Sequence, residues 1–371
     1  MPFYNDLRPP ADYETRDYAL VFPKMTPAEK KRTIEGLLRL RGGFANLPAK
    51  RADQNLLIAS WNIKEFGHTN QRLPEAFFYI AEIIAQFDLV AVQELKSGMA
   101  DLELLMRILG SDWDFIVNDI TNGTDGNSER SAYLFNKERV QLSGLAGEIT
   151  LWDELTAGSA IKQLKRAPYL TGFKSGWKTF AMINLHLHPG DDADDLALRG
   201  EDVRLLLAAI AEKIARNQLW SRNLILVGDF NFYDADEATI RLIEGAGFFE
   251  IQGLKGIDTN ASLTEAYDRF FLTRNDYFQV VKNSAGTDRA GVFTPFMHVY
   301  QTGEHATYRE EMLEDYTGAK DLANDDVALE RYYRHPWRKN QVSDHFPIWF
   351  ELTVDSSETF LRNKLAQLEA L

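Results

Sequence analysis

The sequence predicts an α/β or α+β domain in which β-sheets are covered by helices, and two observations predict it. Short apolar runs of strand length are mixed along the chain with longer segments whose apolar residues recur at helical spacing. Several strand-like runs, such as Leu224–Val227, are apolar at every position, which indicates strands that are buried on both faces. Such sheets need a covering layer on each side, so we expect a layered domain.

The composition is that of an ordinary globular protein. The chain has 371 residues, of which 45% are hydrophobic and 26% charged, enough for one large domain or two ordinary ones. The absence of cysteine excludes disulfides, thiolate metal sites and cysteine nucleophiles in this sequence, and it fits a reducing compartment.

Charge and hydropathy argue against a generally basic nucleic-acid-binding protein and against a membrane-spanning one. The net charge of −14 gives no general attraction to nucleic acid, although local Arg, Lys and a bound cation can bind phosphate within an acidic protein. No apolar run approaches the roughly 18 residues that a membrane span needs. The N-terminus has no basic stretch followed by an apolar core, so we expect no secretory signal and a cytoplasmic protein.

Residues 1–54 are expected to form an N-terminal helical extension. Thr26 and Glu29 make a capping box around Pro27, and Gly42-Gly43 marks the end of the helix. Such a basic amphipathic helix binds a partner or a membrane surface, or it packs on the main domain; we favour packing.

Residues 55–355 are expected to form the main domain. Strands are predicted at 56–61, 89–92, 133–135, 179–183, 224–227 and 348–352, and helices at 75–86, 100–109 and 196–216. The segment 274–340 is less regular and is predicted to be an insertion or long loop region. Residues 356–371 are predicted to form a C-terminal helix docked on the body, with a dimer helix as the alternative.

Polar side chains follow the predicted strands. Asn62 and Glu94 come after the first two, and Asp229 and Asn231 lie two residues apart after the strand 224–227, so they share a face if that strand continues. Alone, Asn62 is typical of a turn and Glu94 of a helix N-terminus. They become metal ligands only if other oxygen ligands converge on them.

Histidines stand at further strand ends. His345 follows Asp344, and both reach one site only if the chain bends there, because adjacent strand residues face opposite ways. Asp268 is a carboxylate that can orient an imidazole. The spacing of His186 and His188 suits a zinc pair, but no third nitrogen ligand is evident and the nearby Asp and Asn favour a hard cation. We interpret the acidic loop 191–195 as a solvated turn rather than a calcium site.

Taken together and in order, these segments resemble the endonuclease/exonuclease/phosphatase superfamily, in its deoxyribonuclease I-like branch. The resemblance runs from about Leu56 to Leu352. It is carried by the strings Asn62-Ile63-Lys64-Glu65-Phe66-Gly67, Gln93-Glu94, Gly228-Asp229-Phe230-Asn231, Tyr267-Asp268-Arg269 and Ser343-Asp344-His345. It implies a four-layer sandwich, with two facing mixed β-sheets flanked by helices and the strand ends of both sheets meeting in one cleft.

The resemblance also implies a role for each matched residue. Glu94 matches the metal-binding glutamate, and Asn62 and Asp344 match positions close to the metal, which we expect to be Mg²⁺, with Mn²⁺ or Ca²⁺ as alternatives. His345 matches the histidine that acts as general base or polarises the scissile phosphate, and Asp268 matches its orienting carboxylate.

Further matches complete the expected site. His186 matches the second histidine of the deoxyribonuclease branch, and Glu129 resembles the carboxylate that orients it. Arg166 resembles an arginine that grips phosphate, a role we also expect for Asn62 and Asn231. Asp229 and Asn231 align the phosphate or the nucleophile.

We therefore expect a Mg²⁺-dependent phosphodiesterase that hydrolyses nucleic acid, with DNA preferred over RNA and a DNA endonuclease as the specific expectation. Water attacks phosphorus in line in the implied mechanism. The alternatives are a phosphomonoesterase or phospholipid head-group phosphodiesterase of the same fold, and a non-enzymatic binding module. Aromatic and basic residues of the 274–340 segment either contact bases and phosphates or form an ordinary folded loop: Tyr332, Tyr333, Arg334, Trp337, Arg338 and Lys339.

Overall fold

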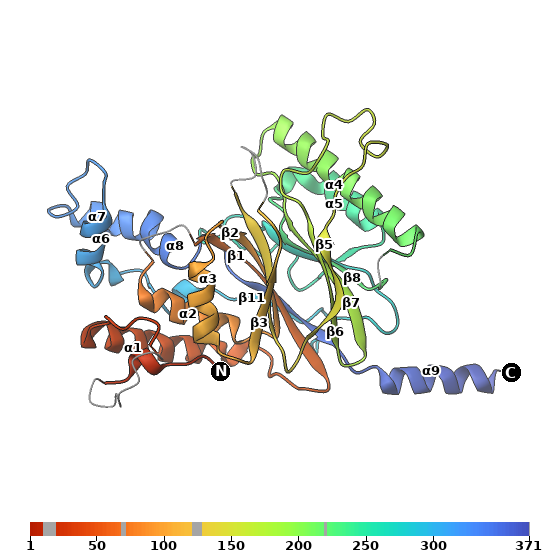
Figure 1. The fold of residues 1–371 in the computed structure, drawn as a ribbon, viewed down its shortest axis with the longest axis horizontal. Helices are drawn as coiled ribbons and strands as arrows, with labels where there is room; N and C mark the ends of the chain where they lie inside the picture. Colours follow the sequence, from red (N-terminus) through yellow and green to blue (C-terminus); the bar gives the residue numbers. More distant parts are fainter. Residues whose placement is uncertain (10–19, 68–71, 121–127, 219–220, 371) are drawn as a thin grey trace.

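The computed structural model describes residues 1–9, 20–67, 72–120, 128–218 and 221–370. Two six-stranded sheets face each other in the described chain and helices cover both outer faces, which confirms the expected four-layer sandwich (Figure 1). The first sheet runs, from edge to edge, β11 (Ala290–Val292), β12 (Ile348–Thr353), β1 (Asn55–Phe66), β2 (Leu89–Leu95), β4 (Arg130–Asn136) and β3 (Trp113–Val117).

The second sheet positions several site residues through its register. Its order is β5 (Gln141–Glu148), β6 (Tyr169–Ser175), β7 (Lys178–His186), β8 (Leu224–Asp229), β10 (Asp268–Leu272) and β9 (Phe249–Glu250). Asp229 at the end of β8 lies opposite His186 of the parallel strand β7 and opposite Asp268 of the antiparallel strand β10. Three polar residues therefore meet where three neighbouring inner strands of this sheet end or begin.

Helices α2 (Pro74–Ile84) and α3 (Ala100–Leu109) lie on the first sheet and α1 (Pro27–Gly43) packs on α2, whereas α4 (Ala193–Ala215) and α5 (Glu237–Gly245) lie on the second sheet (Figure 1). Short helical turns join some of these elements: η1 (Asn5–Leu7), η4 (Phe44–Asn46) and η5 (Asp234–Asp236). The core between the sheets is rich in fully buried aromatic side chains, each of which stabilises the fold by roughly 1.5–3 kcal/mol.

The predicted helices and most predicted strands are confirmed within a few residues. The sequence did not indicate β3, β5, β6, β9 or β11. The strand β5 shows why, because six of its eight residues are exposed and its sequence has no apolar run. An edge strand of this kind carries little hydrophobic signal.

The N-terminal helix α1 packs on the body, as favoured above. Leu37 and Leu40 are buried in the same core as α2, and the Arg32 Nε lies 2.6 Å from the Glu75 Oε2. Among the helices of the described ranges, none is long and apolar enough to cross a membrane.

The segment 274–340, predicted to be an insertion or a long loop region, holds more regular structure than a loop. It contributes β11 and then the helical module (residues 294–341), built from η6 (Pro295–Met297), η7 (Glu304–Ala306), α6 (Arg309–Asp315), α7 (Asp326–Tyr332), η8 (Tyr333–Trp337) and α8 (Arg338–Gln341). Tyr333 and Trp337 are 0% exposed and belong to the core beneath α1 and α2. The helices are too short to show a clear 3.6-residue period, which is why the sequence resembled a loop.

The C-terminal helix α9 (Ser357–Glu369) forms as predicted but does not dock along its length. It projects from the body, and none of its residues is buried (Figure 1). Only its first turns touch the body, where the Phe360 ring centre lies 6.1 Å from those of Trp177 and Tyr277. Leu361 and Leu365 remain 66% and 58% exposed, so the predicted docking is wrong for that stripe.

Candidate active site

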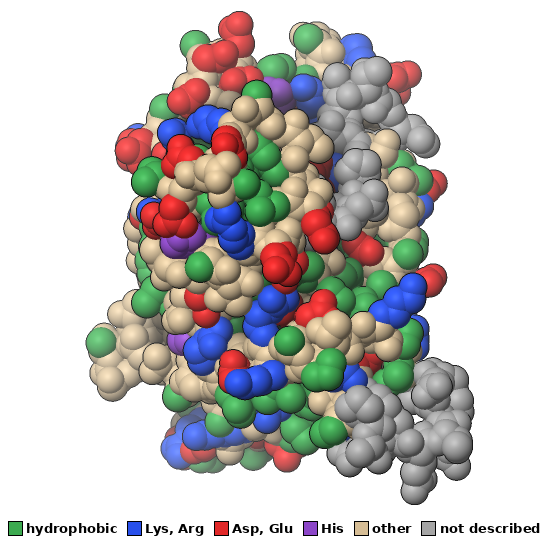
Figure 2. All heavy atoms as spheres, turned by 90° about the vertical axis from the view of Figure 1, so that its left-hand side faces the viewer, with side chains coloured by type: hydrophobic (Ala, Val, Ile, Leu, Met, Phe, Trp, Pro, Cys, Tyr) green, Lys and Arg blue, Asp and Glu red, His purple; other side chains and the backbone are tan. Residues whose placement is uncertain are grey.

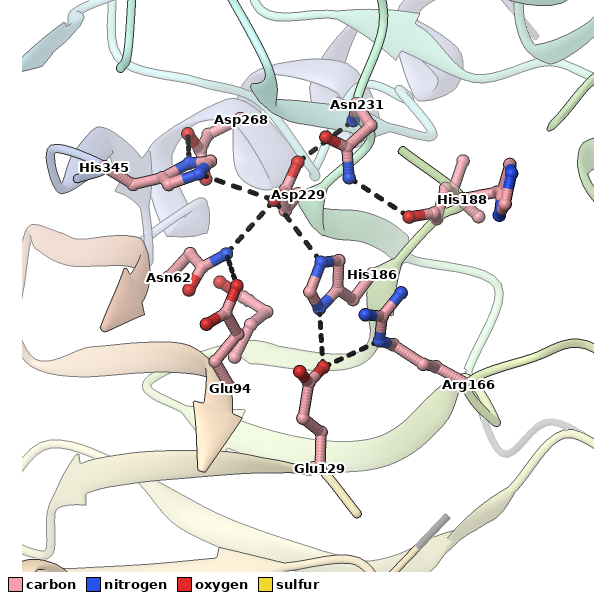
Figure 3. Close-up of polar contacts among 12 residues, drawn as sticks. Asn62, Glu94, Glu129, Arg166, His186, His188, Asp229, Asn231, Asp268 and His345 are labelled. Atoms are coloured by element: carbon pink, nitrogen blue, oxygen red, sulfur yellow. Dashed lines mark hydrogen bonds and ion pairs between the residues drawn. The ribbon is translucent and has the colours of Figure 1, made fainter. Parts of the chain in front are cut away.

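The Asp229 carboxylate lies at the centre of the polar cluster between the two sheets (Figure 3). Its Oδ2 atom lies 3.1 Å from the Asn62 Nδ2, 3.6 Å from the His186 Nε2 and 3.7 Å from the His345 Nε2. Asp229 is only 2% exposed. One buried oxygen thus gathers an amide and two imidazoles that the chain supplies from positions far apart in the sequence.

The backbone around Asp229 is unusual. Gly228 has φ +132°, and a Cβ atom there would lie 2.0 Å from the Leu185 carbonyl oxygen, so glycine lets β8 approach β7 closely. Asn231 has φ +50° and lies beyond the end of β8, so the expected shared strand face does not exist. A turn places the two residues together instead, with the Asn231 N–H donating to the Asp229 Oδ1 at 3.0 Å.

His345 and Asp268 form the pair that was predicted. The His345 Nδ1 lies 2.8 Å from the Asp268 Oδ2, which also accepts a hydrogen bond from the Thr259 hydroxyl at 2.7 Å. Burial opposes protonation of His345, but the carboxylates of Asp268 and Asp229 outweigh it and hold its pKa well above the ordinary value. Burial in turn raises the pKa of Asp268, against the effect of the adjacent imidazole.

The bend that brings His345 into the site is built by Ser343. Its hydroxyl donates to the Asn62 carbonyl oxygen at 2.6 Å and accepts from the N–H groups of Lys64 and His345, both at 3.1 Å. This hydroxyl ties the 343–345 segment to the end of β1. The sequence offered Ser343 only as part of a string, because a serine beside a histidine carries no signal of its own.

His186 and Glu129 form a second pair across the cluster. The His186 Nδ1 lies 3.3 Å from the Glu129 Oε2, which accepts a hydrogen bond from the Arg166 Nε at 2.7 Å. The Lys96 Nζ donates to the other Glu129 oxygen at 3.3 Å. Burial favours the neutral acid, but His186 and Arg166 outweigh it and hold the pKa of Glu129 well below the ordinary value. The sequence analysis missed Lys96, although its position two residues after Glu94 placed it near the site.

Of the three expected metal ligands, Asn62 and Glu94 lie side by side, whereas Asp344 is partly exposed and lies beside a lysine. Glu94 accepts a hydrogen bond from the Asn62 Nδ2 at 2.9 Å, and the Asn62 Oδ1 is buried without a hydrogen-bond partner in the described chain. An unpaired buried oxygen beside a carboxylate fits a hard cation. Asp344 is 35% exposed at its side chain and lies 3.5 Å from the Lys64 Nζ.

Asn62 and Glu94 are therefore the better-placed candidates for holding Mg²⁺. Within the described ranges, no group of three or more His, Asp or Glu side chains comes together to hold an ion. An ion at Asn62 and Glu94 would use an amide oxygen and one carboxylate, which suits Mg²⁺ because it commonly keeps several waters.

Below the cluster, a buried amide bridge joins the two sheets. The Gln93 Nε2 of β2 donates to the Asn184 Oδ1 of β7 at 2.7 Å and to the Ser60 hydroxyl at 3.1 Å. The Asn184 Nδ2 donates to the Val92 carbonyl oxygen at 3.1 Å. This bridge fixes the spacing between the sheets directly beneath the catalytic candidates. Asn184 lies inside an apolar run, and such a position is the signal that could have found it.

His188 is not part of the cluster, so the zinc pair considered above does not form. The His188 Nε2 lies 2.7 Å from the Asp195 Oδ1, away from Asp229 (Figure 3). In the same acidic loop, the Asp192 side chain caps α4 by accepting from the N–H groups of Asp194 and Asp195 at 2.9 Å. The acidic loop is a structured cap and a histidine partner rather than a wholly solvated turn.

Comparison with known proteins gives a family and several relatives. Residues 59–345 match the model of the "Endonuclease/Exonuclease/phosphatase family". A deoxyribonuclease of Thioalkalivibrio sp. (strain K90mix) is 26% identical over 325 residues, which cover 84% of this chain and 76% of that protein. Deoxyribonuclease-1 of Bos taurus is 27% identical over 256 residues, covering 64% and 83%.

Solved structures show the same fold. An endonuclease/exonuclease/phosphatase family protein from Bacteroides thetaiotaomicron aligns with a TM-score of 0.50 and 18% identity, covering 81% of this chain and 98% of its own. A mannosyl-6-phosphatase of Bacteroides thetaiotaomicron aligns with a TM-score of 0.50 and 19% identity, covering 80% and 99%.

Proposed function

This chain belongs to the endonuclease/exonuclease/phosphatase family, in its deoxyribonuclease I-like branch, and on that premise we propose that it is a Mg²⁺-dependent endonuclease acting on DNA. As a family member it is a phosphoester hydrolase. The curated relatives named deoxyribonuclease support a nucleic-acid substrate, and DNA before RNA.

The observation that carries the proposal is the paired arrangement of two histidines. The Nε2 atoms of His186 and His345 both face the Asp229 Oδ2, at 3.6 and 3.7 Å, and each Nδ1 faces a buried carboxylate. Hydrolysis of a phosphodiester needs one group to take a proton from water and another to give a proton to the leaving oxygen. Two imidazoles, each oriented by its own carboxylate, supply both.

Different residues would orient the histidines, bind the phosphate and hold the metal ion. Asp268 and Glu129 hold the two rings in place through their Nδ1 atoms, so that each Nε2 is free to exchange a proton. Arg166, already anchored on Glu129, lies where its guanidinium can neutralise a phosphate oxygen. Asn62 and Glu94 would hold Mg²⁺, which supplies Lewis-acid stabilisation of charge on the phosphoryl oxygens.

A substrate panel tests the proposal. The protein should nick supercoiled plasmid DNA in the presence of Mg²⁺ and stop when a chelator is added. Inositol phosphates, phospholipids and sugar phosphates should turn over far more slowly. Turnover of one of those compounds without metal-dependent nicking would reject the nuclease assignment and favour a phosphomonoesterase or a head-group phosphodiesterase of the same fold.

A further inference from the structure

The helical module carries its charges in two separate blocks. The stretch 304–330 contains nine Asp and Glu residues against one Arg and one Lys. The stretch 331–339 contains Arg331, Arg334, His335, Arg338 and Lys339 and has no carboxylate. Figure 2 views the molecule from the side of this module and shows groups of acidic side chains with Lys and Arg between them. In a chain of net charge −14, a basic block without carboxylates is a distinct local feature.

Only part of this basic block is available to a ligand. Arg338 is 7% exposed, donates its Nη1 to the Tyr300 carbonyl oxygen at 3.3 Å and lies 4.5 Å from the Phe296 ring centre, so it belongs to the core. Arg331 and Arg334 are exposed, and the structure shows neither in an ion pair with any described residue. Lys339 is partly exposed.

The available residues continue directly into the active site. The Lys339 Nζ donates to the Ser262 hydroxyl at 3.3 Å. Burial lowers the pKa of Lys339, the Asp344 carboxylate opposes this, and the charges of Lys64 and Arg338 lower it further, which places Lys339 near Lys64. Lys64 belongs to β1, two residues after Asn62, and its Nζ lies 3.5 Å from the Asp344 Oδ2.

The pKa of His335, within the basic block, shows that the cations of the block lie close together. Burial lowers its pKa, and the charges of Lys339, Arg334, Arg338 and Arg331 lower it further. The four cations therefore lie close together around His335, and the Asp344 carboxylate acts on Lys339, at the end of the block nearest the active site. The mutual repulsion of these cations is relieved when a polyanion binds.

We propose that Lys64, Lys339, Arg334 and Arg331 form a phosphate-binding ridge that holds the nucleic-acid backbone beyond the scissile phosphate. This inference rests on the proposed function, because it concerns how the same site retains a polymeric substrate. A duplex presents one negative charge per about 1.7 Å of axis, so a row of cations outside the cleft matches several phosphates. A small phosphoester fills only the cleft and gains nothing from the ridge.

The test compares two triple variants that remove the same charge. The ridge variant is Arg331→Ala, Arg334→Ala and Lys339→Ala. The control variant is Arg216→Ala, Arg241→Ala and Arg362→Ala, three arginines that are 65%, 70% and 76% exposed at the side chain and lie outside the module. Binding of a 30-base-pair DNA duplex is measured with chelator present, so that no cleavage occurs, over a series of salt concentrations.

The slope of log Kd against log salt is the decisive quantity. Each lost phosphate contact lowers its magnitude by about 0.9, so the ridge variant should lose about two to three, whereas the control variant should keep the wild-type slope. With Mg²⁺, the ridge variant should also show a raised KM for the duplex relative to the control. For a dinucleotide, the two variants should have the same KM.

Each result has one meaning. Equal slopes for the ridge and control variants overturn the ridge while leaving the nuclease proposal in place. A wild-type protein that binds and cleaves no nucleic acid overturns both. Thermal melting checks the fold of each variant; should the ridge triple melt early, the exposed single variant Arg334→Ala replaces it, with an expected loss of about 0.9 in slope.

Discussion

Replacing Asp268 with asparagine tests the orienting role of its carboxylate. The Asp268 Oδ2 contacts the His345 Nδ1 at 2.8 Å and the side chain is fully buried. Asparagine has nearly the same shape, so Asp268→Asn leaves no cavity, and the Thr259 hydroxyl can still donate to the amide oxygen. A charge-assisted hydrogen bond contributes about 1.5–3 kcal/mol, so its loss should lower kcat/KM for plasmid nicking about ten- to 150-fold.

A pH profile gives the Asp268→Asn variant a second readout. Because the Asp268 carboxylate raises the pKa of His345, the limb of the profile that reports this histidine should move to lower pH. His345→Ala should lower the rate at least about a hundredfold, and adding Asp268→Asn to it should cost little more, since the two residues act as a unit.

The control for Asp268→Asn is Asp202→Asn, which changes a buried carboxylate on α4, outside the site. A folded Asp268→Asn protein with a rate within about threefold of wild type, or with an unmoved pH profile, would refute the orienting role.

Three other variants probe separate parts of the structure. Glu129→Gln leaves Arg166 and His186 beside a neutral amide, so nicking should fall by about ten- to a hundredfold. A rate equal to that of the control Glu212→Gln, which changes a partly exposed glutamate of α4, would contradict the pairing. Burial raises the pKa of Asp202 to about 7 from an unfolded value of 3.8; the folded state then binds the extra proton, so stability is lost as pH rises from about 4 to 7. Asp202→Asn should remove that loss and stabilise the protein at pH 8 by up to about 4 kcal/mol in urea unfolding; parallel pH dependences in both proteins would show that Asp202 is not responsible. Saturating Mg²⁺ should raise the melting temperature of the wild type, and Glu94→Gln should reduce that rise; an undiminished rise would place the ion elsewhere.

The sequence predicted the layered fold well because the buried strands are uninterrupted apolar runs. The run before Asp229 and the run before Glu94 mark both the strands and the polar residues that end them. Resemblance to a known family then supplied the pairing of His345 with Asp268, which no local pattern contains because the two residues are 77 positions apart.

Other features were beyond the reach of local patterns. The turn at Asn231 depends on a left-handed backbone conformation, so the argument from a continuing strand failed there. The helical module was predicted to be an insertion or a long loop region, and the burial of Trp337 was not predicted, because tertiary burial rather than local period orders these short helices. The leucines of α9 show the opposite case. Their helical spacing correctly predicted a helix, but no part of the described chain packs over them.

Each histidine and its carboxylate come from opposite halves of the sandwich. His186 ends β7 of the second sheet while Glu129 precedes β4 of the first, and Asp268 begins β10 of the second while His345 precedes β12 of the first. Neither sheet alone contains a working pair. During synthesis on the ribosome, neither histidine can therefore meet its carboxylate until almost the whole chain has emerged and the two sheets have packed together.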